Sequence, residues 1–269
     1  MIETSRKAPG PLIARFGAGD LDLFDAEERK RFLDPFGPLA DAALQGDEEA
    51  WHELAPDIAT ELLYRKEPDL YERLISGERI HRDVIEWLPS SVGTAVEVAA
   101  GTGRLTMDVA GRCHRLIAVE PVAQLSSSLG AKLDRSGVSN VEVRRGFFDE
   151  IPVPSDQADL VVSCSALTSD RWHGGEPGLA EMVRVAAPGG LIALVWPADV
   201  DWLRAQGFNY ESFPGEMFVE FADAAEAAAI ARIFYPHAVD EIVRLGLERV
   251  PYDLLGMNPP RDVAWKRVS

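Results

Sequence analysis

Short apolar segments alternate with helix-like segments between residues 91 and 198. Each apolar segment is four to six residues long, which is the length of a strand and too short for a helix. Strands that are mostly apolar on both faces and alternate with helices predict a parallel sheet covered on both sides. The predicted strands are Thr94–Val98, Leu116–Val119, Val141–Arg144, Leu160–Ser163 and Leu191–Trp196, and the helices between them include Arg104–Ala110, Val122–Leu133 and Leu179–Val185.

The segment before these strands has a different pattern. Residues 1–20 hold two prolines and three glycines with little periodicity, so we expect a flexible arm that orders only when something docks on it. From residue 21 to 66 the pattern is helical and acidic. Pro68 can begin a longer helix that runs to Leu88. Residues 21–90 are therefore predicted to be a helical cap followed by the helix that precedes the first strand.

The C-terminal part departs from the alternation. Residues 199–234 combine an aromatic, loop-like stretch with an alanine-rich helix, which predicts a lid-like insertion over the site. Arg249–Leu255 and Asp262–Val268 then predict two strands. Because no helix separates them, these two strands are expected to pair antiparallel. Residues 91–269 thus form one predicted α/β domain that carries the insertion.

Composition narrows the class of protein. The chain has 269 residues, of which 46% are hydrophobic, and a formal net charge of −17. That charge opposes binding to nucleic acid or to an anionic membrane surface. Two cysteines, Cys113 and Cys164, provide neither a disulfide framework nor a four-ligand zinc site. Met1–Lys7 lacks a signal peptide's apolar core, and no apolar run approaches a membrane span. The sequence therefore predicts a cytoplasmic protein.

Candidate chemistry begins at the end of the first predicted strand. Glu97 lies inside an apolar run, where a carboxylate is costly unless something satisfies it. Gly101 and Gly103 follow, at a turn that begins a helix. Exposed backbone N–H groups at such a turn suit a ligand that carries a carboxylate or a phosphate.

Glu120 ends the second predicted strand, seventeen residues after Gly103. The carboxyl ends of parallel strands form the ligand-binding edge of an open α/β sheet. The two oxygens of a carboxylate suit the vicinal hydroxyls of a ribose, so the turn and Glu120 together predict a nucleoside ligand. A dinucleotide fingerprint needs a third glycine three residues after the second, and Thr106 occupies that position.

The pattern acid-x-small-x-Gly-x-Gly, formed by Glu97, Ala99, Gly101 and Gly103, resembles the first motif of class I S-adenosylmethionine-dependent methyltransferases. Asp159–Cys164 resembles the fourth motif, and Glu181–Leu191 resembles the helix, turn and strand that follow it. The resemblance covers roughly residues 71–198 well and the C-terminus loosely. It implies a Rossmann-like α/β fold with a seven-stranded, mostly parallel sheet whose last strand is antiparallel. The helical cap adds to that fold.

The resemblance also implies the cofactor, S-adenosylmethionine, and the residues around it. Glu97 and the turn after it are expected to surround the methionine moiety, and Glu120 the ribose. Phe147 stands where relatives often place an acid, so an aromatic stack is expected to recognise the adenine. The predicted cofactor residues are Tyr71, Glu97, Ala99, Ala100, Gly101, Gly103, Glu120, Pro121, Phe147, Phe148, Ser163 and Cys164.

Methyl transfer is an in-line displacement, so the protein mainly aligns the acceptor and manages one proton. His173, in the loop after the fourth strand, is the predicted base, and a plain surface histidine is the alternative. No set of residues has the spacing of a metal site. The predicted acceptor-binding residues are Trp172, Trp196, Tyr210, Tyr235 and His237, each of which could instead serve packing alone.

We interpret the chain as an enzyme that methylates an O, N or C atom of a small organic metabolite. Ser163–Ala166 lacks the Asn/Asp-Pro-Pro-aromatic motif of nucleic-acid and protein methyltransferases, and the acidity also favours a small acceptor. The alternatives are a catalytically silent cofactor-binding regulatory partner, an NAD-dependent oxidoreductase and a nucleic-acid methyltransferase. The expected partner is the small-molecule acceptor, without nucleic acid or membrane, and the sequence leaves a homodimer open.

Overall fold

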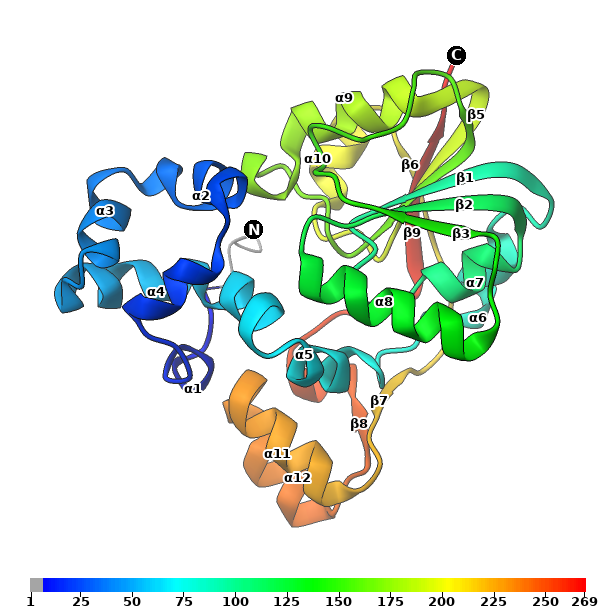
Figure 1. The fold of residues 1–269 in the computed structure, drawn as a ribbon. Coiled ribbons are helices and arrows are strands. Elements are labelled where there is room, and N and C mark those ends of the chain that lie inside the picture. The colour runs from blue at the N-terminus through cyan, green and yellow to red at the C-terminus, as the bar shows by residue number, and fades with distance from the viewer. Residues whose placement is uncertain (1–6) are drawn as a thin grey trace. The chain divides into compact units, whose positions relative to one another are not determined.

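A computed structural model describes residues 7–269 and contains a seven-stranded sheet with the order β3-β2-β1-β4-β5-β9-β6 (Figure 1). Strands β1 to β5 run parallel, and β9 is antiparallel to both β5 and β6. The predicted fold class, including the antiparallel last strand, is therefore confirmed. The strands are β1 (Val92–Val98), β2 (Cys113–Val119), β3 (Val141–Arg144), β4 (Ala158–Cys164), β5 (Ala186–Val195), β6 (Asn209–Ser212) and β9 (Asp262–Arg267).

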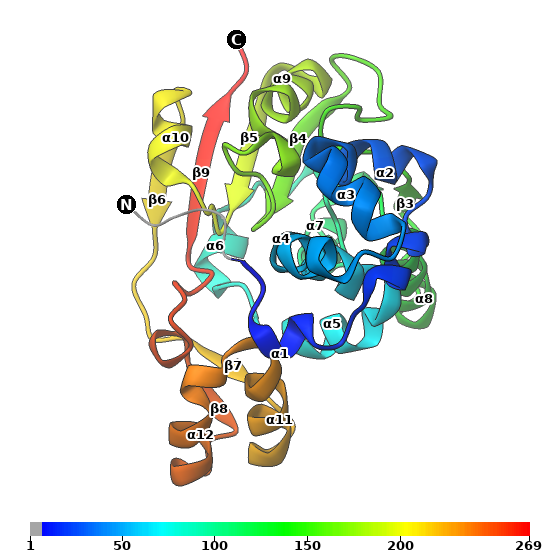
Figure 2. The same ribbon diagram turned by 90° about the vertical axis from the view of Figure 1, so that its left-hand side faces the viewer.

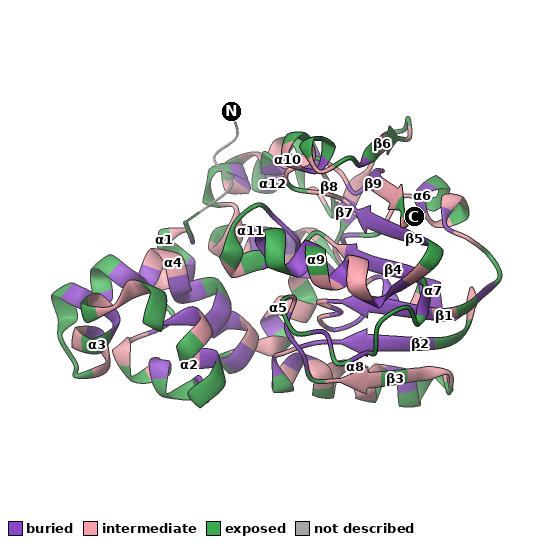
Figure 3. Ribbon diagram, turned by 90° about the horizontal axis from the view of Figure 1, so that it is seen from above, coloured by how far each residue is buried: buried purple, intermediate pink, exposed green. Residues whose placement is uncertain are grey.

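Helices cover both faces of this sheet (Figure 1). One face packs against α6 (Arg82–Trp87), α7 (Thr106–Ala110) and α8 (Ala123–Ser136). The other face packs against α9 (Gly175–Val185) and α10 (Val200–Ala205). Successive residues of a strand point to opposite faces, both of which are covered, which is why the central strands are mostly apolar. Figure 3 shows these strands buried along most of their length.

The chain divides into two compact units. We call residues 79–217 with 259–269 the sheet unit, and residues 1–78 with 218–258 the helical unit. Short 3-10 helices occur in the helical unit at Ala18–Leu23, Asp34–Phe36, Pro236–Ala238 and Tyr252–Leu255. Its other elements are α1 (Gly10–Ile13), α2 (Ala26–Phe32), α3 (Pro38–Leu44), α4 (Glu48–Lys66), α5 (Pro68–Ile75), α11 (Ala224–Phe234), α12 (Val239–Leu245) and the antiparallel pair β7 (Phe218–Glu220) and β8 (Arg249–Pro251) (Figure 2).

A buried ion-pair cluster lies within the helical unit. The Arg65 side chain is fully buried and contacts the carboxylates of Glu61 at 2.7 Å and Glu28 at 3.1 Å. The Phe24 ring centroid lies 4.2 Å from the guanidinium carbon. Burying an arginine in this way requires such partners, because an unpaired charge in the interior is strongly unfavourable.

The expected flexible arm is wrong for residues 7–20, and residues 1–6 lie outside the described part. Leu12 and Phe16 are buried, and the Ala8 N–H donates to the Pro56 carbonyl at 2.8 Å. Burying these apolar side chains against the helices contributes the free energy that orders the segment. The proline and glycine content alone did not indicate this burial.

The predicted helix from Pro68 to Leu88 is two helices, because the chain breaks at Gly77. The Gly77 carbonyl accepts from the Glu220 N–H at 3.1 Å. A Cβ atom on Gly77 would stand 2.1 Å from the Glu220 carbonyl oxygen. A long-range backbone contact that only glycine permits therefore ends the helical pattern.

The predicted organisation of the C-terminal part also needs correction. Residues 199–234 are not one insertion: α10 and β6 belong to the sheet unit, whereas residues 218–234 belong to the helical unit. The strands at 249–251 and 262–267 do not pair with each other, since β8 pairs with β7 and β9 lies between β5 and β6. The two strands are close in the sequence but do not pair, because residues 218–258, which include β8, belong to the helical unit, whereas residues 259–269, which include β9, belong to the sheet unit.

Candidate active site

Four parallel strands place predicted site residues at one edge of the sheet. The glycine turn follows β1, Glu120 follows β2, Ser163 and Cys164 end β4, and Trp196 follows β5. Their common position results from the parallel direction of these strands, whose carboxyl ends meet at one edge. We call this edge the carboxyl edge.

The backbone at the carboxyl edge is strained at three non-glycine residues. Ala99, Ser165 and Trp196 have φ values of 58°, 53° and 52°, and each directly follows or lies next to the end of a strand. A left-handed conformation costs a residue with a Cβ about 1–2 kcal/mol. Such strain concentrates at functional sites, where the surrounding structure holds it in place. The strained backbone therefore singles out the ends of β1, β4 and β5 without reference to any sequence motif.

Glu120 joins the end of β2 to the glycine turn. Its carboxylate accepts from the Gly101 N–H at 2.8 Å and from the Val122 N–H at 2.9 Å, one bond on each oxygen. Glu120 is 4% exposed, and Pro121 beside it is half-buried. Glu120 therefore fixes the shape of the turn from the end of the neighbouring strand.

Glu97 is 1% exposed and lies between Ala118 of β2 and Val162 of β4 in the sheet register. Burial raises the pKa of its carboxyl to about 8. The nearby Thr106 hydroxyl opposes this rise, and the charges of Glu120 and Asp108 add to it. A carboxyl in these surroundings is protonated at neutral pH unless a cationic ligand favours its charged form.

Several polar atoms are buried here without a hydrogen-bond partner among the described residues. They are Glu97 Oε2 and the hydroxyl oxygens of Thr102 and Ser163. Buried polar groups in native proteins are almost always paired, with protein, water or ligand. A cluster of unpaired ones beside the glycine turn fits a site that receives a polar molecule.

The two phenylalanines after β3 have different surroundings. Phe147 is 7% exposed, and the Arg145 guanidinium lies 5.9 Å from its ring centroid. Phe148 packs against the core cluster beneath α9, where a Cβ on Gly178 would stand 2.9 Å from the Phe148 Cβ. Packing alone accounts for Phe148, and contact of either ring with adenine stays a prediction.

His173 lies in a 3-10 turn (Arg171–His173) after β4 and is exposed. Asp170 caps this turn by accepting from the N–H of Trp172, a half-buried residue, at 2.9 Å. A plain surface histidine, the alternative prediction, would be exposed in the same way. The structure thus orders the loop around His173 but gives no support of its own for a catalytic histidine.

The remaining predicted residues, the cofactor residue Tyr71 and three acceptor residues, are divided between the units. Tyr210 lies on β6 in the sheet unit, and its hydroxyl donates to Asp262 Oδ2 at 2.7 Å. Tyr71, Tyr235 and His237 belong to the helical unit, where Tyr71 packs edge-on against Tyr64 and the Tyr235 hydroxyl contacts Met257 Sδ at 3.3 Å. Their participation in the site stays a prediction.

Asp262 is a buried acid that sequence patterns did not identify. It is 8% exposed, and its backbone carbonyl accepts from the Trp196 N–H at 2.9 Å, which places it beside the end of β5. Its position at the start of a strand preceded by Asn258-Pro259-Pro260-Arg261 gave only the signal of a turn. A charged residue adjoining the apolar run Val263-Ala264-Trp265 was the available sign of a special role.

Within residues 7–269, no group of three or more His, Cys, Asp or Glu side chains is arranged to hold a metal ion. Over the same residues, every helix is too short or too polar to cross a membrane.

Part of the chain resembles a known protein family. Residues 95–190 match a family described as a methyltransferase domain. An uncharacterised methyltransferase of Mycobacterium bovis is 30% identical over 131 residues, which are 46% of this chain and 50% of that protein. One from Schizosaccharomyces pombe is 29% identical over 152 residues, covering 53% of this chain and 57% of that one. The chain thus spans about half the length of the curated relatives it matches.

Solved structures resemble the chain at lower identity. An S-adenosylmethionine-dependent methyltransferase from Aquifex aeolicus has a TM-score of 0.45 and 17% identity, covering 57% of this chain and 93% of that one. A protein from Bacillus halodurans, provisionally described as a methyltransferase, has a TM-score of 0.46 and 15% identity, covering 74% of this chain and 98% of that one.

Proposed function

We propose that this protein, whose residues 95–190 match a methyltransferase-domain family, transfers a methyl group from S-adenosylmethionine to an O, N or C atom of a small organic acceptor. The observation that carries the proposal is the glycine turn fixed by Glu120 beside the unpaired polar atoms of Glu97 and Thr102. The cytoplasmic location expected from the sequence belongs to the same proposal.

The residues of the carboxyl edge fit the cofactor. Glu120, at the end of β2 beside the glycine turn, would accept from the ribose hydroxyls. Glu97 would be drawn toward its charged form by the cationic groups of the methionine moiety. The backbone from Ala99 to Gly103 would approach the ligand closely, since the turn is left-handed at Ala99, Gly101 and Gly103 and the two glycines carry no side chain.

When bound, S-adenosylmethionine supplies an electrophilic methyl group on a sulfonium. The chain then has to align the acceptor and exclude water at the ends of β4 and β5. Ser163, Cys164 and Trp196 lie at those ends, and Trp196 is held by its hydrogen bond to the Asp262 carbonyl and by the Arg104 guanidinium 5.2 Å from its ring. We assign these three residues to the transfer side of the site.

Calorimetric titration with S-adenosylhomocysteine tests the cofactor half of the proposal. We expect one site per chain, and no binding at millimolar ligand would reject it. Formation of S-adenosylhomocysteine from S-adenosylmethionine with a panel of small amines, phenols and acids then tests transfer. Cofactor binding without turnover of any acceptor would favour the regulatory partner. Binding of NAD in place of S-adenosylhomocysteine would favour an oxidoreductase.

A further inference from the structure

A pocket lies within the sheet unit, where β6 ends and β9 begins. Its volume is about 540 Å³, which suits a small ligand. Because β9 is antiparallel to both β5 and β6, its first residue lies at the same edge of the sheet as the last residues of those two strands. The pocket therefore belongs to the carboxyl edge. The residues that line it are Ser212, Phe213, Pro214, Gly215, Glu216 and Arg261.

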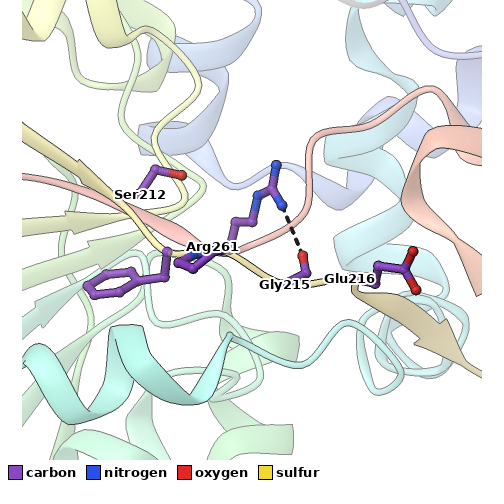
Figure 4. Close-up of a pocket in the computed structure, with 6 residues that line it drawn as sticks. Ser212, Gly215, Glu216 and Arg261 are labelled. Atoms are coloured by element: carbon purple, nitrogen blue, oxygen red, sulfur yellow. Dashed lines mark hydrogen bonds between the residues drawn. The ribbon is translucent and has the colours of Figure 1, made fainter.

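The backbone on both sides of this pocket is fixed by hydrogen bonds. The Phe213 N–H donates to the Arg261 carbonyl at 2.8 Å, which extends the pairing of β6 and β9 by one residue. Figure 4 shows the Arg261 side chain crossing to the neighbouring segment, where its Nη1 donates to the Gly215 carbonyl at 2.9 Å. The guanidinium is thus held in position before any ligand binds, which lowers the entropy lost on binding.

The Arg261 guanidinium keeps most of its hydrogen-bonding capacity. It has five N–H donors, and the bond to Gly215 uses one of them. Among the described residues, no carboxylate forms an ion pair with it. Figure 4 shows the Glu216 side chain directed away from it, and the buried Asp262 carboxyl accepts from the Tyr210 hydroxyl at 2.7 Å instead. A guanidinium stays charged at every physiological pH, so a cation lines the pocket.

This arrangement favours a carboxylate as the ligand group. A planar guanidinium with open N–H groups matches a carboxylate, which can accept two parallel bonds from it. The single charge of Arg261, with the acid Glu216 also lining the pocket, favours a singly charged group over a phosphate dianion. Charges farther away than about 8 Å are screened at physiological ionic strength, so the net charge of −17 does not decide the local preference.

The pocket also has apolar surface and lies near the transfer side of the site. The Phe213 ring stacks on the His81 ring, with the centroids 6.4 Å apart. The Asp262 carbonyl, one residue after Arg261, accepts from the Trp196 N–H at the end of β5. One strand separates β5 from β6, so the ends of these two strands lie about 10 Å apart, which is two strand spacings. An elongated small molecule can span that distance.

We propose that this pocket binds a carboxylate of the methyl acceptor, with the Arg261 guanidinium as its counter-charge. The acceptor class is therefore a small organic acid whose apolar body is long enough to reach from the end of β6 to the end of β5. The role as acceptor rests on the proposed methyl transfer, whereas the carboxylate site itself does not need it.

The binding test uses phenylacetate and its uncharged analogue phenylacetamide, titrated into the full chain and followed by NMR. We expect phenylacetate to bind at least about tenfold more tightly, since a charge-assisted bond is the stronger one. Arg261→Gln removes the charge and should abolish this preference. Arg267→Gln is the matched control and should keep it, because Arg267 Nη1 also donates to a glycine carbonyl, that of Gly189 at 2.9 Å, but at the other end of β9.

Glu216→Gln is a second variant, which leaves Arg261 in place. Removing the nearby negative charge should tighten phenylacetate binding by about twofold to fivefold, the range for an exposed charge pair. Phenylacetamide binding should not change. Weaker phenylacetate binding in this variant would contradict the proposal, because it would show that the ligand depends on the acid.

Equal binding of the two probes by the natural chain would overturn the proposal, as would an undiminished preference in Arg261→Gln. If Arg261→Gln does not fold, the ¹H–¹⁵N resonance of the Arg261 Nε in the natural chain decides. Phenylacetate must shift this resonance more than phenylacetamide does at equal occupancy of the site, and equal shifts would reject the assignment of Arg261.

A transfer assay tests the role as acceptor separately. Acids that also carry an amine or a phenol should form S-adenosylhomocysteine with a KM at least about tenfold below that of their amides, and Arg261→Gln should remove the difference. Equal KM values, with the phenylacetate preference intact, would overturn the acceptor role and leave the carboxylate site. Failure of S-adenosylhomocysteine to bind, with that preference intact, would instead reject methyl transfer itself.

Discussion

Glu97 shows how one buried side chain links the site to the pH dependence of folding. Its pKa rises from 4.5 to about 8 on burial, so the folded chain holds a proton that the unfolded chain releases. The free energy of unfolding should therefore fall as pH rises from about 4.5 to about 8. The titration of this one carboxyl changes the free energy of unfolding by at most about 1.4 kcal/mol per pH unit.

Glu97→Gln removes that titration, since the amide imitates the protonated acid. We expect urea unfolding of the variant to show a flatter pH dependence than the natural chain across that interval. Glu142→Gln is the matched control, because Arg144 and Arg115 lower the pKa of Glu142 to about 2. Its stabilising contribution is present above its unfolded pKa and is lost only as pH falls toward 2, so its removal leaves the slope from 4.5 to 8 unchanged. An unaltered slope in Glu97→Gln would contradict the assignment.

Glu120 can be tested by ligand affinity. Glu120→Gln replaces an acceptor oxygen with an amide donor that faces the Gly101 or Val122 N–H, and it removes the charge offered to the ribose. S-adenosylhomocysteine binding should weaken by about 1.5–3 kcal/mol, the range for hydrogen bonds to charged groups. Calorimetry measures this, with Glu142→Gln again as the control on an exposed acid. An unchanged dissociation constant would remove Glu120 from the site.

At the scale of elements, the turn between β1 and α7 requires glycine at residue 103. Its φ is 92°, and an added Cβ would stand 2.6 Å from Leu129 Cδ1 of α8. Gly103→Ala should lower the free energy of unfolding by about 1–3 kcal/mol and also weaken S-adenosylhomocysteine binding.

The control for this turn is Gly130→Ala, one residue after Leu129 in α8. An added Cβ there meets nothing within 4 Å, so a helix-interior alanine should stabilise the chain by about 0.5–1 kcal/mol. Chemical unfolding measures both variants. If Gly103→Ala were as stable as the natural chain, the turn would not be held in the conformation described.

At the scale of the whole molecule, the chain divides into two compact units. Arg65→Met leaves Glu28 and Glu61 buried without their cation, which should destabilise the helical unit by about 3–5 kcal/mol. Hydrogen exchange should accelerate in residues 7–78 and 218–258. Arg15→Met is the control, since its pair with Glu67 is partly exposed and should contribute about 1 kcal/mol or less.

The same variant also tests whether the helical unit takes part in cofactor binding. Unchanged S-adenosylhomocysteine affinity in Arg65→Met would place every cofactor contact in the sheet unit. Weakened affinity would support the predicted contribution of Tyr71, which lies in the helical unit.

The sequence by itself determined the parallel sheet and the resemblance to class I methyltransferases, because both depend on local signals. Apolar strands of four to six residues alternate with helices, and the residues of the turn from Glu97 to Gly103 are contiguous. Glu120 was recognisable because parallel strands bring their ends to one edge whatever the details of packing.

Only the tertiary structure decided which distant segments meet. Asn209–Ser212 is an edge strand of four residues with no burial alternation, so no pattern marked it, and its pairing with β9 results from long-range contacts. Gly77 broke a helix through a contact with Glu220, 143 residues away. The structure alone places Arg261 and Asp262 beside the ends of β6 and β5. Periodicity reports which face of an element is buried, whereas such pairings arise from the packing of the whole chain, which no local pattern records.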